Sequence, residues 1–298
     1  MRVSVVIVSW NRKNDLRDTL RSVLSQNYLS LEIVVVDNCS TDGSPEMVKQ
    51  DFPGVNLIQP ERQLSACQSY NTAMKRSTGD IVVILDNDVV LGEDWIRQVV
   101  AELETDSQLG AMASRVVNFY TKEEIWGFGR FTKNEYFMKE FYCTTFIGCA
   151  AAIKNEILRQ IGYYSEEFEI YVNEADLAAR LLRAGYRIKY NPAIVAYHKV
   201  SPSQRGKGRK LFYSTRNFIW YYWEFYPFPQ VLVASAVRIA VGLLEAVRTG
   251  LVRLYVRAVR EAIAGLPRHI SRRTPLKILK RTYSWKQLKE DYLVAYRS

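Results

Sequence analysis

The feature that most constrains this chain is a run of five apolar residues, 81–85, that leads directly into Asp86-Asn87-Asp88. Four of the five are β-branched, which predicts a strand buried on both faces of a sheet. Two carboxylates at the end of a buried strand are costly unless a cation lies near them. A divalent ion with oxygen ligands, which also keeps diphosphate oxygens as partners, meets this need. The alternative is an Asp/Asn-rich turn without a metal.

The surrounding sequence predicts an α/β fold. Apolar runs predict strands at residues 3–8, 31–36, 55–58, 80–85, 109–117 and 146–153, and helical spacing predicts helices at 16–24, 66–76, 95–103, 155–161 and 171–186. This alternation is typical of βαβ units and a largely parallel sheet, whose ligands bind at the carboxyl ends of the strands. No Gly-x-Gly-x-x-Gly follows the first strand and no Gly-x-x-x-x-Gly-Lys occurs, so a bound nucleotide would need metal and basic side chains around its phosphates.

A second polar group lies at the start of the predicted helix 171–186, where Asn173, Glu174 and Asp176 occur together. Acidic residues there interact favourably with the helix dipole and cap its free N–H groups. For Asp176, capping and a catalytic role both remain open. Glu174, two residues earlier, is a candidate catalytic carboxylate.

The charge of the chain is unevenly distributed. The net charge is +10, but the part from Arg205 onward carries 19 Lys/Arg against 5 Asp/Glu, which indicates an anionic partner such as nucleic acid or a lipid surface. The four cysteines have no C-x-x-C spacing and only two histidines occur, which disfavours a thiolate-rich zinc site and makes a reducing cytosol the simpler expectation. The first apolar run is too short for a signal peptide, so we expect the chain to start in the cytosol.

Residues 231–266 form an apolar segment interrupted by charges. Arg238, Glu245, Arg253 and Arg260 recur seven or eight residues apart, which predicts one helix with a charged stripe and no membrane span. Such a helix suits the plane of an anionic bilayer. Packing against the catalytic domain or a partner subunit, including a homodimer, is the alternative. Nucleic acid is disfavoured because the apolar face is broad and no recognition motif occurs.

Taken together, these segments resemble family 2 glycosyltransferases with a GT-A fold. The resemblance covers roughly residues 3–226 and rests on segments 9–12, 36–44, 85–88, 185–188 and 197–198. Arg216-Asn217 is similar to a pair in members that modify cell-surface polysaccharides, including rhamnosyltransferase-like ones. The resemblance implies a Rossmann-like nucleotide-diphospho-sugar transferase fold in residues 1–226, with a basic, membrane-associating helical region in residues 227–298.

The resemblance also implies roles for individual residues. Asp37 would bind the nucleobase, Asp86 the ribose, and Asp88 with His198 a Mg²⁺ or Mn²⁺ ion. The implied catalytic residues are Glu174, as the base, and Asp176. The implied donor-binding residues are Ser9, Trp10, Asn11, Arg12, Asp37, Gln63, Asn71, Asp86, Asn87, Arg205 and Lys207.

Two positions depart from the family pattern. Asn173-Glu174-Ala175-Asp176 replaces the usual Glu-Asp-x-Asp, so the base would be one methylene longer, and Ser65 replaces a glycine. The expected function is inverting, metal-dependent sugar transfer from a nucleotide-diphosphate donor to a lipid-linked or polysaccharide acceptor in cell-surface glycan synthesis, by a cytoplasmic enzyme on the inner face of the cell membrane. The alternative is a non-catalytic nucleotide-sugar or glycan-binding protein. A nucleotidyltransferase is disfavoured, because its Gly-rich, Lys-containing start is absent.

Overall fold

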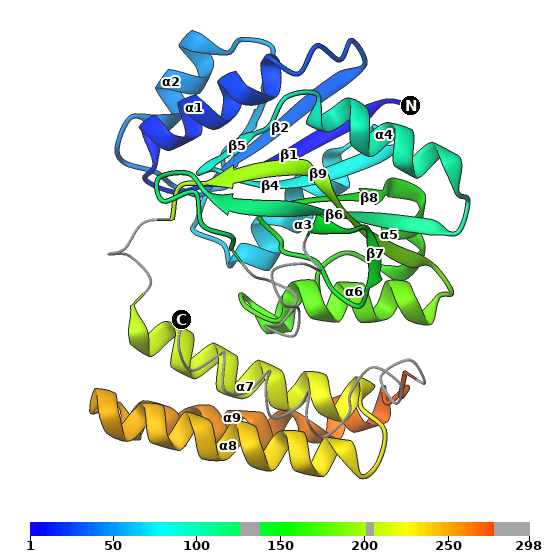
Figure 1. Cartoon of the computed structure of the whole chain (residues 1–298). Coiled ribbons are helices and arrows are strands. Elements are labelled where there is room, and N and C mark those ends of the chain that lie inside the picture. Colours follow the sequence, from blue (N-terminus) through cyan, green and yellow to red (C-terminus); the bar gives the residue numbers. More distant parts are fainter. Residues whose placement is uncertain (126–137, 201–205, 277–298) are drawn as a thin grey trace.

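The computed structural model describes residues 1–125, 138–200 and 206–276, and its elements are drawn in Figure 1. The strands are β1 (Val3–Ser9), β2 (Leu31–Asp37), β3 (Asn56–Ile58), β4 (Ile81–Asp86), β5 (Val89–Leu91), β6 (Leu109–Asn118), β7 (Phe141–Cys143), β8 (Ala150–Lys154) and β9 (Arg187–His198). The helices are α1 (Lys13–Leu24), α2 (Ser44–Asp51), α3 (Ala66–Arg76), α4 (Trp95–Thr105), α5 (Asn155–Ile161), η2 (Glu166–Phe168), α6 (Asn173–Arg183), α7 (Lys207–Phe225), α8 (Gln230–Thr249) and α9 (Val252–Ser271).

The strands form one mixed sheet in the order β3-β2-β1-β4-β8-β6-β9-β5, with β7 paired to β9. The strands β3, β2, β1 and β4 are parallel, as the sequence predicts. The second half differs, because β8 runs antiparallel between β4 and β6. A crossover helix is required only between parallel strands, so β8 can enter the sheet in the opposite direction without one.

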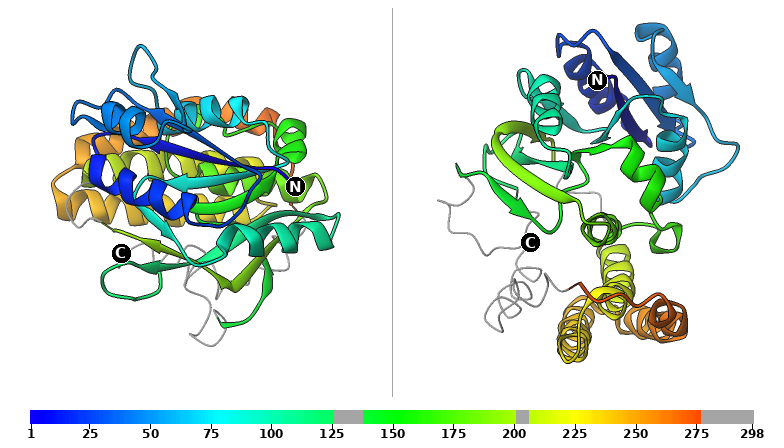
Figure 2. Two further views of the ribbon diagram at one scale, coloured as in Figure 1. Left: turned by 90° about the horizontal axis from the view of Figure 1, so that it is seen from above. Right: turned by 90° about the vertical axis from the view of Figure 1, so that its right-hand side faces the viewer.

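Side chains alternate between two hydrophobic cores, one on each face of the sheet. Val3, Val5 and Ile7 of β1 pack with α1, α2 and α4, whereas Val6 faces the core shared with α3, α5 and α6. Figure 2 shows these two helical layers on opposite sides of the sheet. The period-two alternation of a strand explains why one apolar run serves both cores.

The helix α7 lies between the α/β body and the pair formed by α8 and α9, which we call the helical hairpin (Figures 1 and 2). Trp220 of α7 donates a hydrogen bond from its indole N–H to the carbonyl of Ala262 in α9, at 2.9 Å. Gly265 permits this close packing, since a Cβ there would lie 2.6 Å from the Trp220 ring. The helical layer therefore begins at Lys207, inside the range 1–226 that the sequence assigns to the catalytic domain.

The prediction of one helix across residues 231–266 is wrong. The helix α8 is terminated by Gly250, whose left-handed conformation, with φ +70°, glycine adopts without steric cost. A separate helix, α9, begins after this turn. Arg238 is buried and donates to the Thr215 hydroxyl at 3.4 Å, so it does not share a surface stripe with the arginines of α9. The prediction failed because a helical periodicity carries no information about a turn between two helices.

Candidate active site

The carboxyl ends of three neighbouring strands bring predicted site residues together. In the sheet register, Ser9 lies opposite Asp37 and Val8 lies opposite Asp86. The Asn87 amide donates to the Ser9 hydroxyl at 3.0 Å, which joins the end of β1 to the residue after β4. Four predicted side chains thus lie along one edge of the sheet, where ligands of open α/β sheets bind.

The loop after β1 is tied to the loop after β2. Asn11 has φ +51°, its backbone N–H donates to the Ser40 hydroxyl at 2.9 Å, and its side-chain oxygen accepts from the Thr41 N–H at 2.7 Å. Trp10 and Arg12 flank it, and both line the cavity described below. Trp10 is 52% exposed, so it offers an apolar surface to a ligand.

Asp37 lies behind this surface and is only 1% exposed. One carboxylate oxygen accepts the Ser40 backbone N–H at 2.9 Å. Within the described part of the chain, the other oxygen, Oδ2, is buried and accepts no hydrogen bond. Because an unsatisfied buried carboxylate oxygen costs free energy, an N–H donor from a ligand suits this position.

Asp86, Asp88 and His198 form a cluster whose ligand atoms all lie within 4.8 Å of one another. The strand β5 pairs with β9 and sets Val89 opposite His198, which brings the imidazole beside Asp88, with Nε2 3.1 Å from Oδ1. Two carboxylates and an imidazole fit Mg²⁺ or Mn²⁺, since carboxylates suit both ions. The cluster therefore matches the predicted metal site in residue types and in proximity.

Tyr70 of α3 holds Asp86 in place, because its hydroxyl donates a hydrogen bond to Asp86 Oδ1 at 2.7 Å. Burial, followed by the negative charge of Asp86, raises the pKa of Tyr70 well above its usual value. The phenol therefore keeps its proton and remains a donor to the carboxylate. This hydrogen bond fixes the orientation of Asp86 at the strand end.

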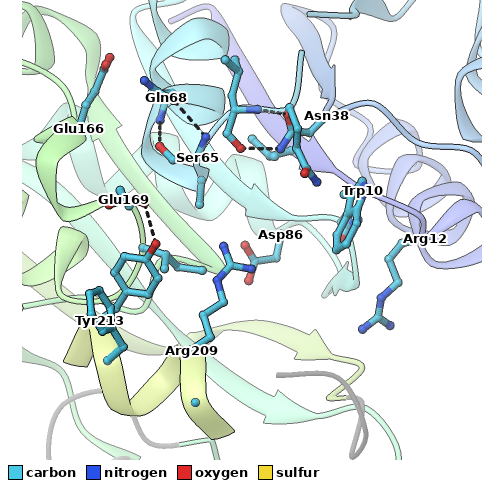
Figure 3. A pocket seen from close by; sticks show the side chains of 18 of the residues that line it. Trp10, Arg12, Asn38, Ser65, Gln68, Asp86, Glu166, Glu169, Arg209 and Tyr213 are labelled. Carbon is cyan, nitrogen blue, oxygen red and sulfur yellow. Dashed lines mark hydrogen bonds between the residues drawn. The ribbon is translucent and has the colours of Figure 1, made fainter. Parts of the chain in front are cut away.

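Trp10, Arg12 and residues 86–88 line a cavity of about 1020 Å³ that extends to the C-terminal helices (Figure 3). The helices α7 and α9 form one wall through Gly208, Arg209, Phe212, Tyr213, Leu254 and Arg257. In Figure 3 the Arg209 side chain points from α7 towards Asp86. Arg209 belongs to the first turn of α7. The contribution of α9 could not be predicted from the sequence, because it depends on how the hairpin packs.

The loop before α3 borders the cavity through Gln63 and Ser65. Asn38 fixes this loop, since its side chain exchanges two hydrogen bonds with the backbone of Leu64, at 2.8 and 2.9 Å. Ser65 caps α3 in a reciprocal pair with Gln68, a capping box. The replacement of glycine by Ser65 thus has a structural reason at the start of the helix.

Seven described residues that were predicted to be donor-binding or catalytic do not line the cavity. Three of them, Ser9, Asn11 and Asp37, belong to the strand ends and loops described above, and the other four are Asn71, Lys207, Asp176 and Glu174. Asn71 is buried and binds the backbone of Tyr164 and the Glu166 carboxylate, at 2.9 and 3.0 Å. Lys207 is exposed at the first turn of α7. The other two, Asp176 and Glu174, are described in the next two paragraphs, and Arg205 lies outside the described residues.

Asp176 is buried and does not cap α6, contrary to the capping interpretation. Its Oδ2 accepts from the Ser165 hydroxyl at 2.9 Å and from the Arg180 guanidinium at 2.7 Å. Arg180 in turn donates to the carbonyls of residues 161, 162 and 163. We infer that Asp176 stabilises the connection between α5 and α6.

Glu174 is half-buried at the first turn of α6, with its carboxylate against Gly148, where a Cβ would clash with Oε1. Gly148 precedes Cys149, whose carbonyl accepts the backbone N–H of Asp86 at 3.0 Å. Burial raises the pKa of Tyr164, and so do the negative charges of Glu174 and, to a smaller extent, Asp86. Glu174 therefore does not line the cavity itself, but it lies against the segment that leads into β8, the neighbour of the strand β4 that ends at Asp86.

Two cavity-lining carboxylates, Glu166 and Glu169, were not predicted. They follow α5 in an irregular segment whose sequence has no strand or helix periodicity. Only the folded chain shows that this segment borders the cavity, because its position depends on contacts with α3 and α7.

Comparisons with known proteins agree with this geometry. Residues 4–162, more than half of the chain, match the model of the family described as Glycosyl transferase family 2. A relative, glucosyl-dolichyl phosphate glucuronosyltransferase of Haloferax volcanii, is 26% identical over 230 residues, which cover 67% of this chain and 70% of that protein. The chain spans about half or less of several other curated relatives that it matches.

Two solved structures share the fold. The mannosyltransferase PcManGT from Pyrobaculum calidifontis, in complex with GDP-Man and Mn²⁺, has a TM-score of 0.61 and 22% identity, with 99% of this chain and 85% of that chain covered. TarS 1–349 of S. aureus, in complex with UDP-GlcNAc, has a TM-score of 0.65 and 16% identity, with 99% and 90% covered. The predicted GT-A architecture is thereby confirmed. The chain belongs to glycosyl transferase family 2 and is an enzyme that transfers a sugar.

Proposed function

We propose that this enzyme is an inverting, metal-dependent glycosyltransferase that moves a sugar from a nucleoside diphosphate to a lipid-linked acceptor. The observation that carries the proposal is the placement of Trp10, Asp86 and Asp88 along one cavity. The solved relatives bound to GDP-Man and UDP-GlcNAc support a nucleotide-sugar donor, and the dolichyl phosphate relative supports a lipid-linked acceptor.

The donor is held from its base to its diphosphate. Trp10 stacks on the nucleobase, and Asp37 Oδ2 accepts a base N–H. Asp86 accepts hydrogen bonds from the ribose hydroxyls, while Asp88 and His198 would hold Mg²⁺ or Mn²⁺. When bound, the ion neutralises charge that develops on the leaving diphosphate. Arg209, which points towards Asp86, contributes a further positive charge at this end of the cavity.

Glu174 serves as the general base. The acceptor hydroxyl approaches the anomeric carbon from the face opposite the diphosphate, and the proton passes to the Glu174 carboxylate as the new bond forms. The position of Glu174 against Gly148, beside the strand that neighbours β4, supports this role. Inversion at the anomeric carbon follows from one displacement.

A thermal-shift screen of nucleotide sugars, with and without Mn²⁺, tests the donor proposal. A ligand that binds only the native state raises the Tm. At a concentration of 100 times its Kd, it stabilises the native state by about 2.7 kcal/mol. We expect a nucleotide sugar to raise the Tm in the presence of Mn²⁺ more than in its absence. No shift with any nucleoside diphosphate or nucleotide sugar would exclude this cavity as a donor site.

Trp10→Ala is expected to raise the donor Kd about 5- to 150-fold, because stacking of a base on an aromatic ring contributes about 1–3 kcal/mol. Titration calorimetry with the donor selected by the screen measures the change. Leu29→Ala is the control, since Leu29 is a fully exposed apolar side chain at the opposite end of β2. An unchanged Kd in Trp10→Ala would show that the base binds elsewhere.

The helical hairpin exposes an apolar face that supports a location on the inner surface of the cell membrane. Length and composition alone qualify α8 as a candidate membrane span, a test that the core helix of a soluble protein also passes. The exposed apolar side chains, which we call the hairpin face, are Leu232, Ile239, Leu243, Leu244, Val247, Val252, Val256, Ile263 and Ile270. Exposed Arg248, Arg253 and Arg260 border it. We infer that the hairpin lies in the headgroup region of an anionic leaflet.

We expect the protein to co-sediment with anionic vesicles at low salt and to be released as the salt concentration rises, because surface charges are screened over about 8 Å at physiological ionic strength. The double variant Leu244→Glu/Val247→Glu should not bind, since it places two charges in the hairpin face. Leu29→Glu, which adds an exposed charge elsewhere, should bind normally. Equal, weak binding to neutral and anionic vesicles would instead assign the hairpin face to a protein partner or a second copy of the chain.

A further inference from the structure

The segment that leads into α6 has an unusual backbone. Glu169, Tyr171 and Val172 have φ values of +60°, +64° and +66°, although none of them is glycine. A β-branched residue such as Val172 rarely adopts this conformation. Such conformations persist only where the surrounding structure fixes them, and they cluster at functional sites. We call residues 167–172 the left-handed turn. It ends one residue before α6, the helix that carries Glu174 in its first turn.

Asn217 of α7 binds the left-handed turn through its side-chain amide. The residue is fully buried, and its Nδ2 lies 2.8 Å from the carbonyl oxygens of Phe168 and Ile170 and 3.0 Å from that of Tyr171. Its Oδ1 accepts a hydrogen bond from Arg216 Nε at 3.0 Å, which fixes the orientation of the amide. One side chain thus satisfies the carbonyls that the irregular backbone leaves outside a helix or sheet.

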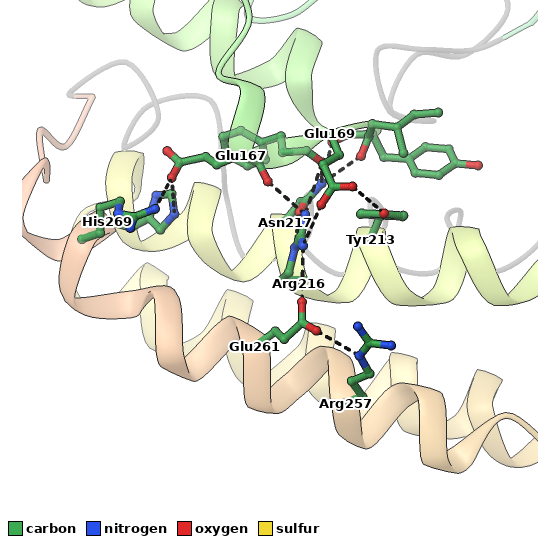
Figure 4. A network of polar contacts seen from close by, with 12 residues as sticks. Glu167, Glu169, Tyr213, Arg216, Asn217, Arg257, Glu261 and His269 are labelled. Atoms are coloured by element: carbon green, nitrogen blue, oxygen red, sulfur yellow. Dashed lines mark hydrogen bonds and ion pairs between the residues drawn. The ribbon is translucent and has the colours of Figure 1, made fainter. Parts of the chain in front are cut away.

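Arg216 binds the other end of the turn. Its guanidinium donates to the Glu167 carbonyl at 3.0 Å and pairs with the Glu169 carboxylate at 3.3 Å. It also pairs with Glu261 of α9 at 3.4 Å and stacks on the Trp220 ring at 4.5 Å. Figure 4 shows these contacts between α7, α9 and the turn.

The same contacts reach the cavity. Glu169 lines it, and its carboxylate accepts a hydrogen bond from the Tyr213 hydroxyl at 2.7 Å. Burial, and then the bond to Glu169, raise the pKa of Tyr213, so the phenol remains a donor. On the opposite side, the Glu169 carbonyl accepts the backbone N–H of Cys67 in α3 at 3.0 Å. The turn is therefore held between α3 and α7.

We propose that Arg216 and Asn217 are positioning residues that hold the left-handed turn in the geometry required by Glu174 for proton transfer. The proposal rests on the proposed function of Glu174. The helix α7 is then part of the catalytic unit, since it supplies Arg209 and Tyr213 to the cavity and fixes the approach to α6. Most of the donor-binding side chains follow β1, β2 and β4, while His198 ends β9 and Arg209 lies two turns before Arg216 in α7. None of these side chains is held by Arg216 or Asn217, so donor affinity should depend little on this pair.

The test compares kcat with donor affinity. Asn217→Asp keeps the size of the side chain but replaces an N–H donor with an acceptor that faces three carbonyl oxygens. We expect kcat to fall about 100-fold, since a misplacement of about 1 Å costs this much, while the donor Kd changes less than about twofold. Arg216→Lys keeps the charge but loses the planar fork, and should lower kcat about 10-fold with the same unchanged Kd.

The control is Asn155→Asp, because Asn155 is also a buried amide, donates to the Gly79 carbonyl at 2.7 Å, and lies in α5. It should lower the Tm without changing kcat. Wild-type kcat in either folded Arg216 or Asn217 variant, or a parallel loss of kcat and donor affinity, would overturn the proposal. If Asn217→Asp does not fold, the kinetics of Arg216→Lys decide the outcome. Glu174→Gln, measured in parallel, separates the proposal that Glu174 is the base from the proposal that Arg216 and Asn217 position it. If Glu174→Gln keeps full activity, the assigned base is wrong, whatever the result for Asn217→Asp.

Discussion

Glu174→Gln is expected to lower kcat by about 10²–10⁴-fold while the donor Kd stays unchanged. The amide keeps the size of the side chain and its packing against Gly148, but it cannot accept a proton at neutral pH. The donor is held by other residues, at the ends of β1, β2, β4 and β9 and in α7. The measurement is steady-state kinetics with the donor identified by thermal shift, together with titration of that donor.

Glu166→Gln and Glu169→Gln test the alternative bases, because both carboxylates line the cavity. Glu169 already accepts a hydrogen bond from Tyr213 and pairs with Arg216, which makes it the less available of the two for proton transfer. Glu156→Gln is the matched control on the exposed side of α5. A dead Glu169→Gln beside an active Glu174→Gln would move the base to the left-handed turn.

Asp176→Asn reports on stability instead of chemistry. If Asp176 were a capping residue, its replacement would lower the free energy of unfolding by about 1 kcal/mol. As the buried partner of Arg180, its loss is expected to cost about 3–5 kcal/mol. Thermal denaturation distinguishes the two values, and kcat per folded molecule should stay near that of the wild type.

Asp88→Asn is expected to abolish metal-dependent turnover, with a loss of about 100-fold or more. A bound ion contributes several kcal/mol of transition-state stabilisation, and each 1.36 kcal/mol is tenfold in rate. Asp88 is buried and is paired with His198 at 3.1 Å. Mn²⁺ should therefore raise the Tm of the wild type but not that of the variant, and EDTA should remove wild-type activity.

The control for the metal site is Asp51→Asn, which removes an exposed carboxylate that pairs with Arg17 on the surface at 3.1 Å. Such a pair contributes about 0–1 kcal/mol, so activity and the Mn²⁺ response should remain. Full turnover of the wild type in EDTA would exclude a metal from the mechanism.

The sequence alone determined the first half of the sheet and the edge at which the site lies. Buried parallel strands are continuous apolar runs, so β1, β2 and β4 and their polar ends were predictable from local residues. The bounds of α3 and α5 agree with prediction for the same reason, since helical spacing and flanking polar residues are local signals. The placement of Ser9, Asp37 and Asp86 along one edge follows from parallel pairing.

Tertiary structure decided the rest, because it depends on contacts between distant residues. His198 reaches Asp88 only because the three-residue strand β5 pairs with β9, and a strand of that length has no periodicity to detect. Gly250 separates α8 from α9 and buries Arg238, which a continuous helical pattern cannot reveal. Glu169 enters the cavity because α3 and α7 hold the left-handed turn from both sides. A local pattern encodes which residues face a core, whereas long-range packing determines which of them meet at the site.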